Sequence, residues 1–433
     1  MLKLLIGAGL IGAVIIAPDA VRSAELKSTV EQLLDDHKRV AAAQADLDAA
    51  RQRSEAASGG WYPTFDATTY YGYEEQNKGQ GSDDTSMPPR VLELSLSQLV
   101  YDFGATEAAI DRSRVEVTQA THTLESTKQE LSLEALNAHL NVLRQRKLLR
   151  FNQGSIANVK RQMQLEDARV QRGSGLATDV LQAKSQLAGL EATQTRIQGA
   201  LRNAINRYRA VFGTEPPTPE GNTRVTLPRV PEDLLPQDLD SAISTALEEN
   251  PRLTATYLGT LVTKQNVIET EADEFYPVIS AKAEKNLKRD EGGTMGGKQE
   301  TLFKVEMSYS LNLGMTATNT LRAAELTHDA GISRYTEERS LIEERVRNAW
   351  TDLETARRRF QQLNNQTDIA SEFLELARRE RQLGNRSLID VLAGETALIN
   401  ATSDAASAEV DVLQAAFRLL TQMGRLTPDA IDG

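Results

Sequence analysis

The chain has 433 residues and a formal net charge of −12, from 61 acidic and 49 basic side chains. This acidic balance argues against a general nucleic-acid binder, whose affinity would rest on a basic surface. The sequence contains no cysteine, so neither disulfides nor a thiol for a lipid anchor are expected. At this length the chain has room for several ordinary domains.

The first 24 residues have the pattern of an export signal. Lys3 precedes an apolar run from Leu4 to Ala17, and small residues follow up to about Ala24. The run is too short, and too often interrupted by glycine, to form a regular membrane-spanning helix. We therefore expect residues 1–24 to be a signal peptide, with the exact cleavage site left open and an uncleaved N-terminal anchor as the alternative. No later apolar run has the length of a membrane helix, so any membrane span must be built from strands.

The remainder of the chain contains one unit twice. Three landmarks recur in the same order at offsets of 214, 210 and 211 residues: Tyr62-Pro63 as Tyr276-Pro277, Gly104 as Gly314, and Asp179-Val180-Leu181 as Asp390-Val391-Leu392. This period is far longer than that of solenoid repeats. We predict a first repeat over residues 25–212, a proline-rich linker over 213–240, a second repeat over 241–426 and a short tail over 427–433.

Each repeat is predicted to hold one hairpin of amphipathic β-strands. Apolar and polar residues alternate over 65–73 and 92–97 in the first repeat, and over 279–284 and 303–311 in the second. A length of about ten residues with this alternation is typical of membrane β-strands. The alternative is a soluble sheet that packs its apolar face on a core. The export signal favours the membrane, as does the lack of any covering segment other than very long helices.

Long helical hairpins are predicted for most of each repeat. The stretches with helical periodicity and scarcely a proline or glycine are 26–57, 105–172 and 177–212 in the first repeat, and 316–382 and 387–424 in the second. A helix over 105–172 would extend on the order of 100 Å. Alanine and glutamine dilute the apolar positions, which indicates coiled-coil packing rather than a thick core. One chain cannot bury such helices alone, so self-association is expected.

This order of elements, present twice, resembles the outer-membrane factor family of TolC-like channel-tunnels. The resemblance covers about Leu26 to Leu426 and includes the Tyr-Pro pairs, the segment Leu99 to Gly104, and a glycine-rich turn before each Asp-Val. It implies a membrane α+β fold, in which a homotrimer forms a twelve-stranded outer-membrane β-barrel with four strands per protomer. A long α-helical coiled-coil barrel would continue it through the periplasm, with residues 213–240 in the equatorial region.

The resemblance also implies a function and partners. The protein would be the outer-membrane export duct of a tripartite transporter, embedded in outer-membrane lipid and working with a periplasmic adaptor and an inner-membrane pump. The lack of a cysteine after the signal favours type I protein secretion with an ABC transporter. Multidrug or small-molecule efflux, with a proton-driven pump, is the alternative. An alternative of another class is a periplasmic coiled-coil adaptor or scaffold, but no lipoyl-like or barrel domain is evident between the helices.

An enzyme has little support in the sequence. The four histidines form no His-x-x-x-His pair; they are His37, His122, His139 and His328. There is no cysteine nucleophile, no Gly-x-Ser-x-Gly segment and no phosphate-binding glycine loop. We therefore expect no catalytic, cofactor or metal site, and no nucleic-acid partner.

The resemblance places a periplasmic gate at two helix–helix turns, residues 172–179 and 383–390. It implies that Arg386 links to Thr178 and Asp179 of the neighbouring turn and holds the entrance shut. It also implies that Asp390 contributes to a carboxylate ring across the pore, an arrangement that attracts cations. The same turns would dock the adaptor, through Gly173, Gly175, Leu176, Gly384, Asn385, Ser387 and Leu388.

The chain departs from the family pattern at two positions in these turns. Ala393 stands where the best-known member has a second aspartate ring, and Arg381 stands where that member has a gating tyrosine. How the gate is latched is therefore open. For Asp179 and Asp390 the alternative is a purely structural role as helix N-caps, which aspartate favours.

Overall fold

The structure is a computed structural model that describes residues 18–77, 84–173, 175–217, 227–229 and 232–431. Most of the expected signal peptide, residues 1–17, lies outside this range. The chain divides into two compact units, and each unit combines segments of both sequence repeats. The first contains residues 1–41, 126–250 and 341–433; the second contains residues 42–125 and 251–340. The compact units therefore do not coincide with the two repeats.

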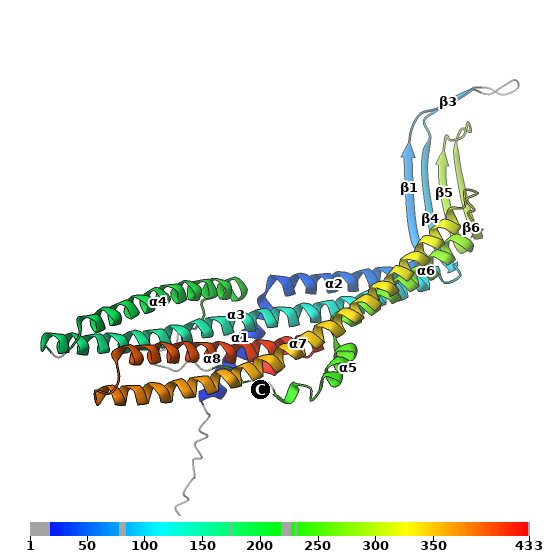
Figure 1. The fold of residues 1–433 in the computed structure, drawn as a ribbon. Helices are drawn as coiled ribbons and strands as arrows, with labels where there is room; N and C mark the ends of the chain where they lie inside the picture. Colours follow the sequence, from blue (N-terminus) through cyan, green and yellow to red (C-terminus); the bar gives the residue numbers. More distant parts are fainter. Residues whose placement is uncertain (1–17, 78–83, 174, 218–226, 230–231, 432–433) are drawn as a thin grey trace, which may run out of the picture. The chain divides into compact units, whose positions relative to one another are not determined.

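The first unit is helical (Figure 1). It comprises α1 (Pro18–Asp36), α4 (Ala177–Phe212), α5 (Leu239–Glu249), α8 (Leu388–Met423), the short η2 (Glu232–Leu234) and η3 (Pro428–Ile431), and the later parts of α3 (Ala105–Gln171) and α7 (Thr316–Gln382). Glycine ends the helical hairpins in the left-handed conformation, with φ of 70° at Gly213 and 79° at Gly424. A side chain at such a residue would be strained, which explains glycine at these helix ends.

Helix α8 carries much of the core of this unit. Its Leu388 and Leu392 pack with Ile156 and Val159 of α3 and with Leu190 of α4. On its other side, α8 packs against α7 through a second small cluster. At Gly394 a Cβ atom would lie 3.2 Å from the side chains of the facing α7 helix, so the two helices pack tightly at this glycine.

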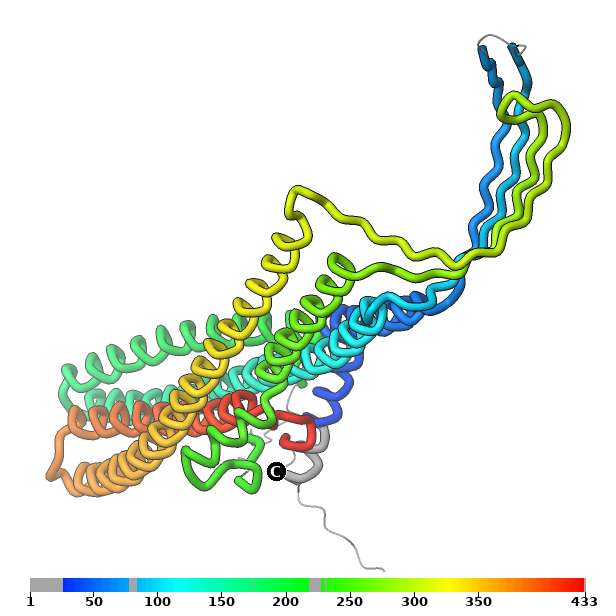
Figure 2. Tube along the Cα trace, turned by 90° about the vertical axis from the view of Figure 1, so that its right-hand side faces the viewer, coloured from blue at the N-terminus to red at the C-terminus, as the bar shows by residue number. Residues whose placement is uncertain are grey.

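The second unit contains the sheet. Strands β1 (Thr64–Tyr71), β4 (Arg90–Tyr101), β5 (Val278–Arg289) and β6 (Gly297–Ser308) form an antiparallel sheet in that order, and Figure 2 shows them side by side. A short ribbon, β2 (Glu74–Gln76) with β3 (Thr85–Met87), extends the loop between β1 and β4. Helices α2 (Lys38–Ser58) and α6 (Pro251–Phe275), η1 (Gly59–Trp61) and the early parts of α3 and α7 complete the unit.

The register gives the sheet one apolar and one polar face. One row across the four strands reads Phe65, Leu96, Ala283 and Phe303. The adjacent row, on the opposite face, reads Thr64, Ser97, Lys282 and Lys304. The apolar side chains are largely uncovered within the chain, since Phe65 is 65% and Phe303 79% exposed. The sheet therefore has a large apolar face that no segment of its own chain covers among the described residues.

The long hairpin helices agree with the predicted ranges to within one or two residues, and both predicted hairpins form antiparallel pairs. Three features were not predicted. The first helix is interrupted at His37, whose ring accepts a hydrogen bond from the Arg39 backbone N–H. Helices α5 and α6 precede the second hairpin, and the β2–β3 ribbon extends the first. Within the part of the chain that the structure describes, no helix combines the length and apolar character needed to cross a membrane.

Candidate functional site

The first candidate turn joins α3 to α4 and depends on glycine. Gly173 has a φ of 76° and donates its backbone N–H to the Val170 carbonyl. At Gly175 a Cβ atom would lie 2.9 Å from the Val170 backbone nitrogen, so only glycine fits. Leu176 is the N-cap residue of α4, makes no side-chain capping bond, and is 66% exposed. The start of α4 is thus left without a side-chain cap.

The second turn joins α7 to α8 and is capped. Gly384 is left-handed with a φ of 84°, and the Asn385 N–H closes the end of α7 on the Glu380 carbonyl. Ser387 is the N-cap of α8: its Oγ accepts from the Asp390 N–H at 3.3 Å and donates to the Asp390 carboxylate at 2.9 Å. This arrangement satisfies a backbone donor at the helix start.

Neither aspartate is itself an N-cap residue, which corrects the capping alternative. Asp179 and Asp390 are both the third residue of their helix, after N-caps Leu176 and Ser387. A carboxylate in the first turn is still favourable because it faces the positive end of the helix dipole. Asp390 is part of the Ser387 cap, whereas the Asp179 carboxylate is engaged by a third helix.

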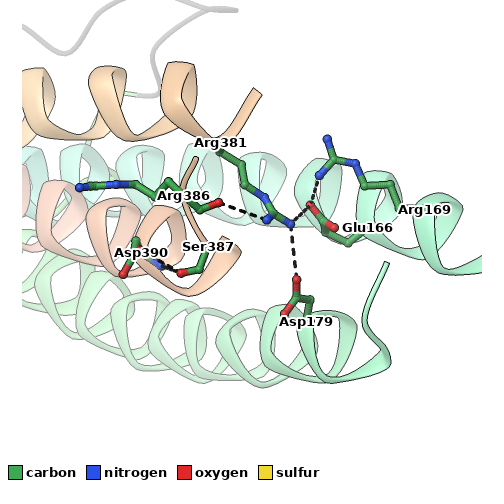
Figure 3. A network of polar contacts seen from close by, with 7 residues as sticks. All are labelled: Glu166, Arg169, Asp179, Arg381, Arg386, Ser387 and Asp390. Atoms are coloured by element: carbon green, nitrogen blue, oxygen red, sulfur yellow. Dashed lines mark hydrogen bonds and ion pairs between the residues drawn. The ribbon is translucent and has the colours of Figure 1, made fainter. Parts of the chain in front are cut away.

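That third helix is α7, and its Arg381 connects the two turns (Figure 3). Its guanidinium lies 3.0 Å from the Glu166 carboxylate of α3 and 3.4 Å from the Asp179 carboxylate of α4. It also donates to the Arg386 backbone carbonyl at 3.2 Å. Arg169 approaches the same oxygen of Glu166 at 3.0 Å. We call Glu166, Arg169, Asp179 and Arg381 the tip ion-pair cluster.

The tip ion-pair cluster is partly buried, which raises its energetic weight. The Glu166 side chain is 3% exposed and the Arg381 side chain 24%. Moving a carboxylate out of water costs several kcal/mol of folding free energy unless cations and hydrogen bonds compensate for the lost hydration. Removing one of its partners leaves part of this desolvation energy uncompensated. In the sequence, Arg381 stands out only as a departure from the family pattern. Glu166 was not predicted, because it lies among other charged residues and nothing in the pattern marks its side chain as buried.

Arg386 has other partners within the chain. Its Nε lies 2.8 Å from the Glu380 carboxylate, and its guanidinium lies over the Phe373 ring, 5.3 Å from the centroid. Inside one chain, therefore, the cation on Asp179 is Arg381 rather than the expected Arg386. The expected link from Arg386 to Thr178 and Asp179 of the neighbouring turn is therefore not formed within the chain, since Arg386 contacts Glu380 and Phe373 instead.

The other predicted site residues divide by exposure. Thr178, Asp390 and Ala393 are exposed. The candidate docking residues Gly173, Leu176, Gly384, Asn385 and Ser387 are exposed as well, and Gly175 is half-buried. Leu388 is the exception, because it is 1% exposed and belongs to the core on α8. The apolar surface of the second turn comes instead from Leu383 and Ile389, which are 76% and 51% exposed.

Comparisons with known proteins agree with this architecture. A family model described as outer membrane efflux protein matches residues 29–214 and 242–425, one match in each repeat. The outer membrane efflux protein BepC of Brucella suis is 25% identical over 78% of this chain and 73% of its own length. TolC of Vibrio cholerae is 20% identical over 94% and 92%. The alkaline protease secretion protein AprF of Pseudomonas aeruginosa is 24% identical over 81% and 72%.

Solved structures show the same fold. The outer-membrane channel OprN superposes with a TM-score of 0.79 at 19% identity, covering 94% of this chain and 92% of its own. VceC of Vibrio cholerae superposes with a TM-score of 0.77 at 18% identity, covering 93% and 96%. With most of its length matched by the family model, the chain belongs to the outer membrane efflux protein family, whose members are outer-membrane channels.

Proposed function

We propose that the protein works as a homotrimer and forms the outer-membrane export duct of a tripartite, envelope-spanning transporter. The observation that carries this proposal is the open, amphipathic four-stranded sheet. Within the described residues β1 and β6 each pair on one side only, so both edges present free backbone groups. In a bilayer such groups must be paired, and an open sheet edge is not tolerated. Three copies joined edge to edge would make a closed barrel of twelve strands.

Aromatic residues at both ends of the sheet support a membrane position. Tyr71 and Tyr73 lie at the loop end, 70% and 72% exposed. Tyr101, Phe103 and Tyr276 form a contacting group at the end where the strands lead into helices. Aromatic girdles of this kind mark the two interfaces of membrane barrels.

The polar face of the sheet suits a water-filled lumen. Cross-strand ion pairs join Lys282 to Glu306 at 2.7 Å and Lys304 to Glu284 at 3.1 Å. The interior of a membrane barrel is polar, whereas a charged side chain on the lipid face is destabilising near the bilayer midplane. The apolar rows on the opposite face would then contact lipid.

The two helix–helix turns would form the periplasmic entrance. In this proposal the tip ion-pair cluster holds the ends of α3, α4 and α7 together within each protomer, and Arg386 adds contacts between protomers. Asp390, exposed and without a second carboxylate at Ala393, would supply the cation-attracting ring. The variant Asp390→Ala removes this negative charge, so multivalent cations should block single channels less strongly. The exposed Leu176, Leu383 and Ile389 would give the periplasmic adaptor apolar contacts.

For the pump and cargo we propose type I protein secretion with an inner-membrane ABC transporter. The 433 residues contain no cysteine, and AprF is named for secretion of an alkaline protease. Small-molecule efflux with a proton-driven pump is the second candidate, favoured by the similarity to BepC, which is named as an efflux protein. A deletion strain separates the two: loss of a secreted protein supports the first, and drug hypersensitivity with unchanged secretion supports the second.

The barrel proposal is tested by placing an arginine on each face of β4. Leu94 is on the apolar face and Ser95 on the polar face. Leu94→Arg should impair assembly by about 2–4 kcal/mol if it lies near the bilayer midplane, and Ser95→Arg should cost far less. Cross-linking and sizing in mild detergent would report the trimer. Equal effects, or a stable soluble monomer in the periplasm, would reject the proposal.

A further inference from the structure

Two arginines lie opposite each other at the loop end of the sheet. Arg90 is the first residue of β4 and Arg289 the last residue of β5, and they are direct cross-strand partners. Directly opposed side chains have Cβ atoms about 5 Å apart, and like charges at that spacing destabilise a sheet. The pairing of two cations at this position therefore calls for a compensating negative group.

Both arginines belong to the apolar face. The next row on the same face is Leu92 with Leu287. The neighbour of Arg90 on β1 is Tyr71, and the Arg90 guanidinium lies over the Tyr71 ring, 5.6 Å from the centroid. The pair thus lies where the apolar rows end in an aromatic side chain, the position of a membrane interface in the proposed barrel.

The charge of the two faces differs in kind. On the polar face, the residues of β1, β4, β5 and β6 include five carboxylates and four lysines, which nearly balance. On the apolar face, the same strands carry three cations, Arg90, Lys285 and Arg289, and no carboxylate. The uncompensated positive charge of the sheet is therefore confined to the side proposed to contact lipid.

Carboxylates near this end of the sheet do little to neutralise the pair. Asp290 lies 3.7 Å from Arg289, whose side chain remains 69% exposed. Glu93 and Glu291 both contact Lys288, which belongs to the polar face. Lys285 is held by the neutral Thr301 hydroxyl at 3.0 Å. Among the ion pairs of the described residues, only Asp290 offsets the charge of the arginine pair, and it lies beside an exposed Arg289.

We propose that Arg90 and Arg289 form a binding site for the phosphate groups of an anionic glycolipid in the outer leaflet of the membrane. The site rests on the proposed function, because it requires the apolar face to contact lipid. Guanidinium groups bind phosphate through parallel N–H donors, and two of them can hold one phosphate between them. The acyl chains of that lipid would lie along Leu92 and Leu287, in the next row of the same face.

The test measures lipid binding by the purified full-length trimer in detergent, with bis-phosphorylated lipid A as the probe. The variant Arg90→Gln/Arg289→Gln removes the pair without adding charge. Basic residues near an anionic membrane surface each contribute roughly fivefold in affinity, so the double variant should bind about 25-fold more weakly. Lys298→Gln is the matched control: it removes one exposed cation at the same end of the sheet but on the polar face, and should bind like the wild type.

A second readout separates this site from a merely structural pair. Without lipid, the double variant should be as stable as the wild type or more stable, since it relieves repulsion, and only the wild type should gain thermal stability when lipid A is added. Dephosphorylated lipid A and inorganic phosphate should give no gain. Equal binding by both proteins, or an equal gain from free phosphate, would overturn the lipid site. Cross-linking measures the oligomeric state independently of lipid binding. An intact trimer that does not bind lipid A selectively rejects only the lipid site, whereas absence of a trimer rejects the proposed function as well.

Discussion

The turn between α3 and α4 and the turn between α7 and α8 descend from one duplicated unit, and equivalent residues lie 211 positions apart. Leu181 and Leu392 are such a pair, yet the first is 64% exposed and the second 5%. Leu176 and Ser387 are another: the first leaves its helix uncapped and the second caps it. The second copy supplies the buried centre of the helical unit, and the first supplies an outer face. The two copies of one unit thus differ in burial: the second copy packs into the core, and the first exposes the equivalent side chain.

The largest effect expected from this comparison is on the paired leucines. Leu392→Ala removes a side chain packed between α3 and α4 and should destabilise the protomer by about 2–5 kcal/mol. Leu181→Ala should change protomer stability by no more than about 0.5 kcal/mol. Thermal unfolding in detergent, measured on monomer and trimer, would show whether Leu181 acts only in the trimer. Similar losses in the monomer would contradict the division between the two helices.

A second comparison sets α3 against α7 at positions 139 and 350. The α3 residue is His139, a half-buried residue whose Nδ1 atom is shielded from water and makes no hydrogen bond within the described residues, whereas the α7 equivalent is a tryptophan that cannot titrate. Burial, with a smaller contribution from Arg146, lowers the pKa of His139 to about 4. Between about pH 6.5 and pH 4 the unfolded chain therefore binds a proton at this histidine and the folded chain does not. The free energy of unfolding falls as the pH drops through this range, by about 3 kcal/mol in total.

The variant His139→Gln should remove this part of the pH dependence. Melting temperatures measured in detergent at pH 7 and pH 5 would fall less in the variant than in the wild type. The same change at His122, a half-buried position on the same helix, serves as the control. Parallel pH profiles for wild type and His139→Gln would show that His139 does not resist protonation.

The third comparison concerns the two arginines of the second turn. Arg381→Gln leaves the buried Glu166 with Arg169 alone and should cost about 2 kcal/mol. Arg386→Ser removes a partly exposed pair with Glu380 and should cost less than about 1 kcal/mol. Both should raise single-channel conductance if the turns gate the pore, and Arg381→Gln should raise it more.

A double variant isolates the buried charge. Adding Glu166→Gln to Arg381→Gln removes the uncompensated carboxylate and should restore part of the lost stability, which a double-mutant cycle would measure. Strict additivity of the two changes would mean that Glu166 and Arg381 do not interact in the assembled protein.

The smallest effect is expected at the caps. Ser387→Ala should destabilise the start of α8 by about 1 kcal/mol, because the Asp390 N–H loses its acceptor. The equivalent change Leu176→Ala removes no capping bond, but it should weaken adaptor binding if exposed Leu176 is part of the docking surface. Hydrogen exchange at the two turns and adaptor pull-down would report these effects. Faster exchange after Leu176→Ala, with unchanged adaptor binding, would reverse the assignment.

Local patterns in the sequence determined the long helices and the strand hairpins. Proline-free stretches with glycine at their ends, such as the segment ending at Gly173, specify where a helix begins and stops, because these preferences act over a few residues. The alternation along β4 likewise specified which residues share a face of the sheet. The two family-model matches agree with the duplication seen in the sequence.

Only the tertiary structure decided which side chain meets which. Nothing local distinguishes Leu181 from Leu392, or marks Glu166 as buried, because burial depends on the helix that packs alongside. Arg381 and Asp179 are 202 residues apart, and the offset between repeats does not pair them. The opposition of Arg90 and Arg289 follows from the register between β4 and β5, strands of different repeats. Such contacts are fixed by the mutual packing of distant segments, a free energy that no single segment of the sequence contains.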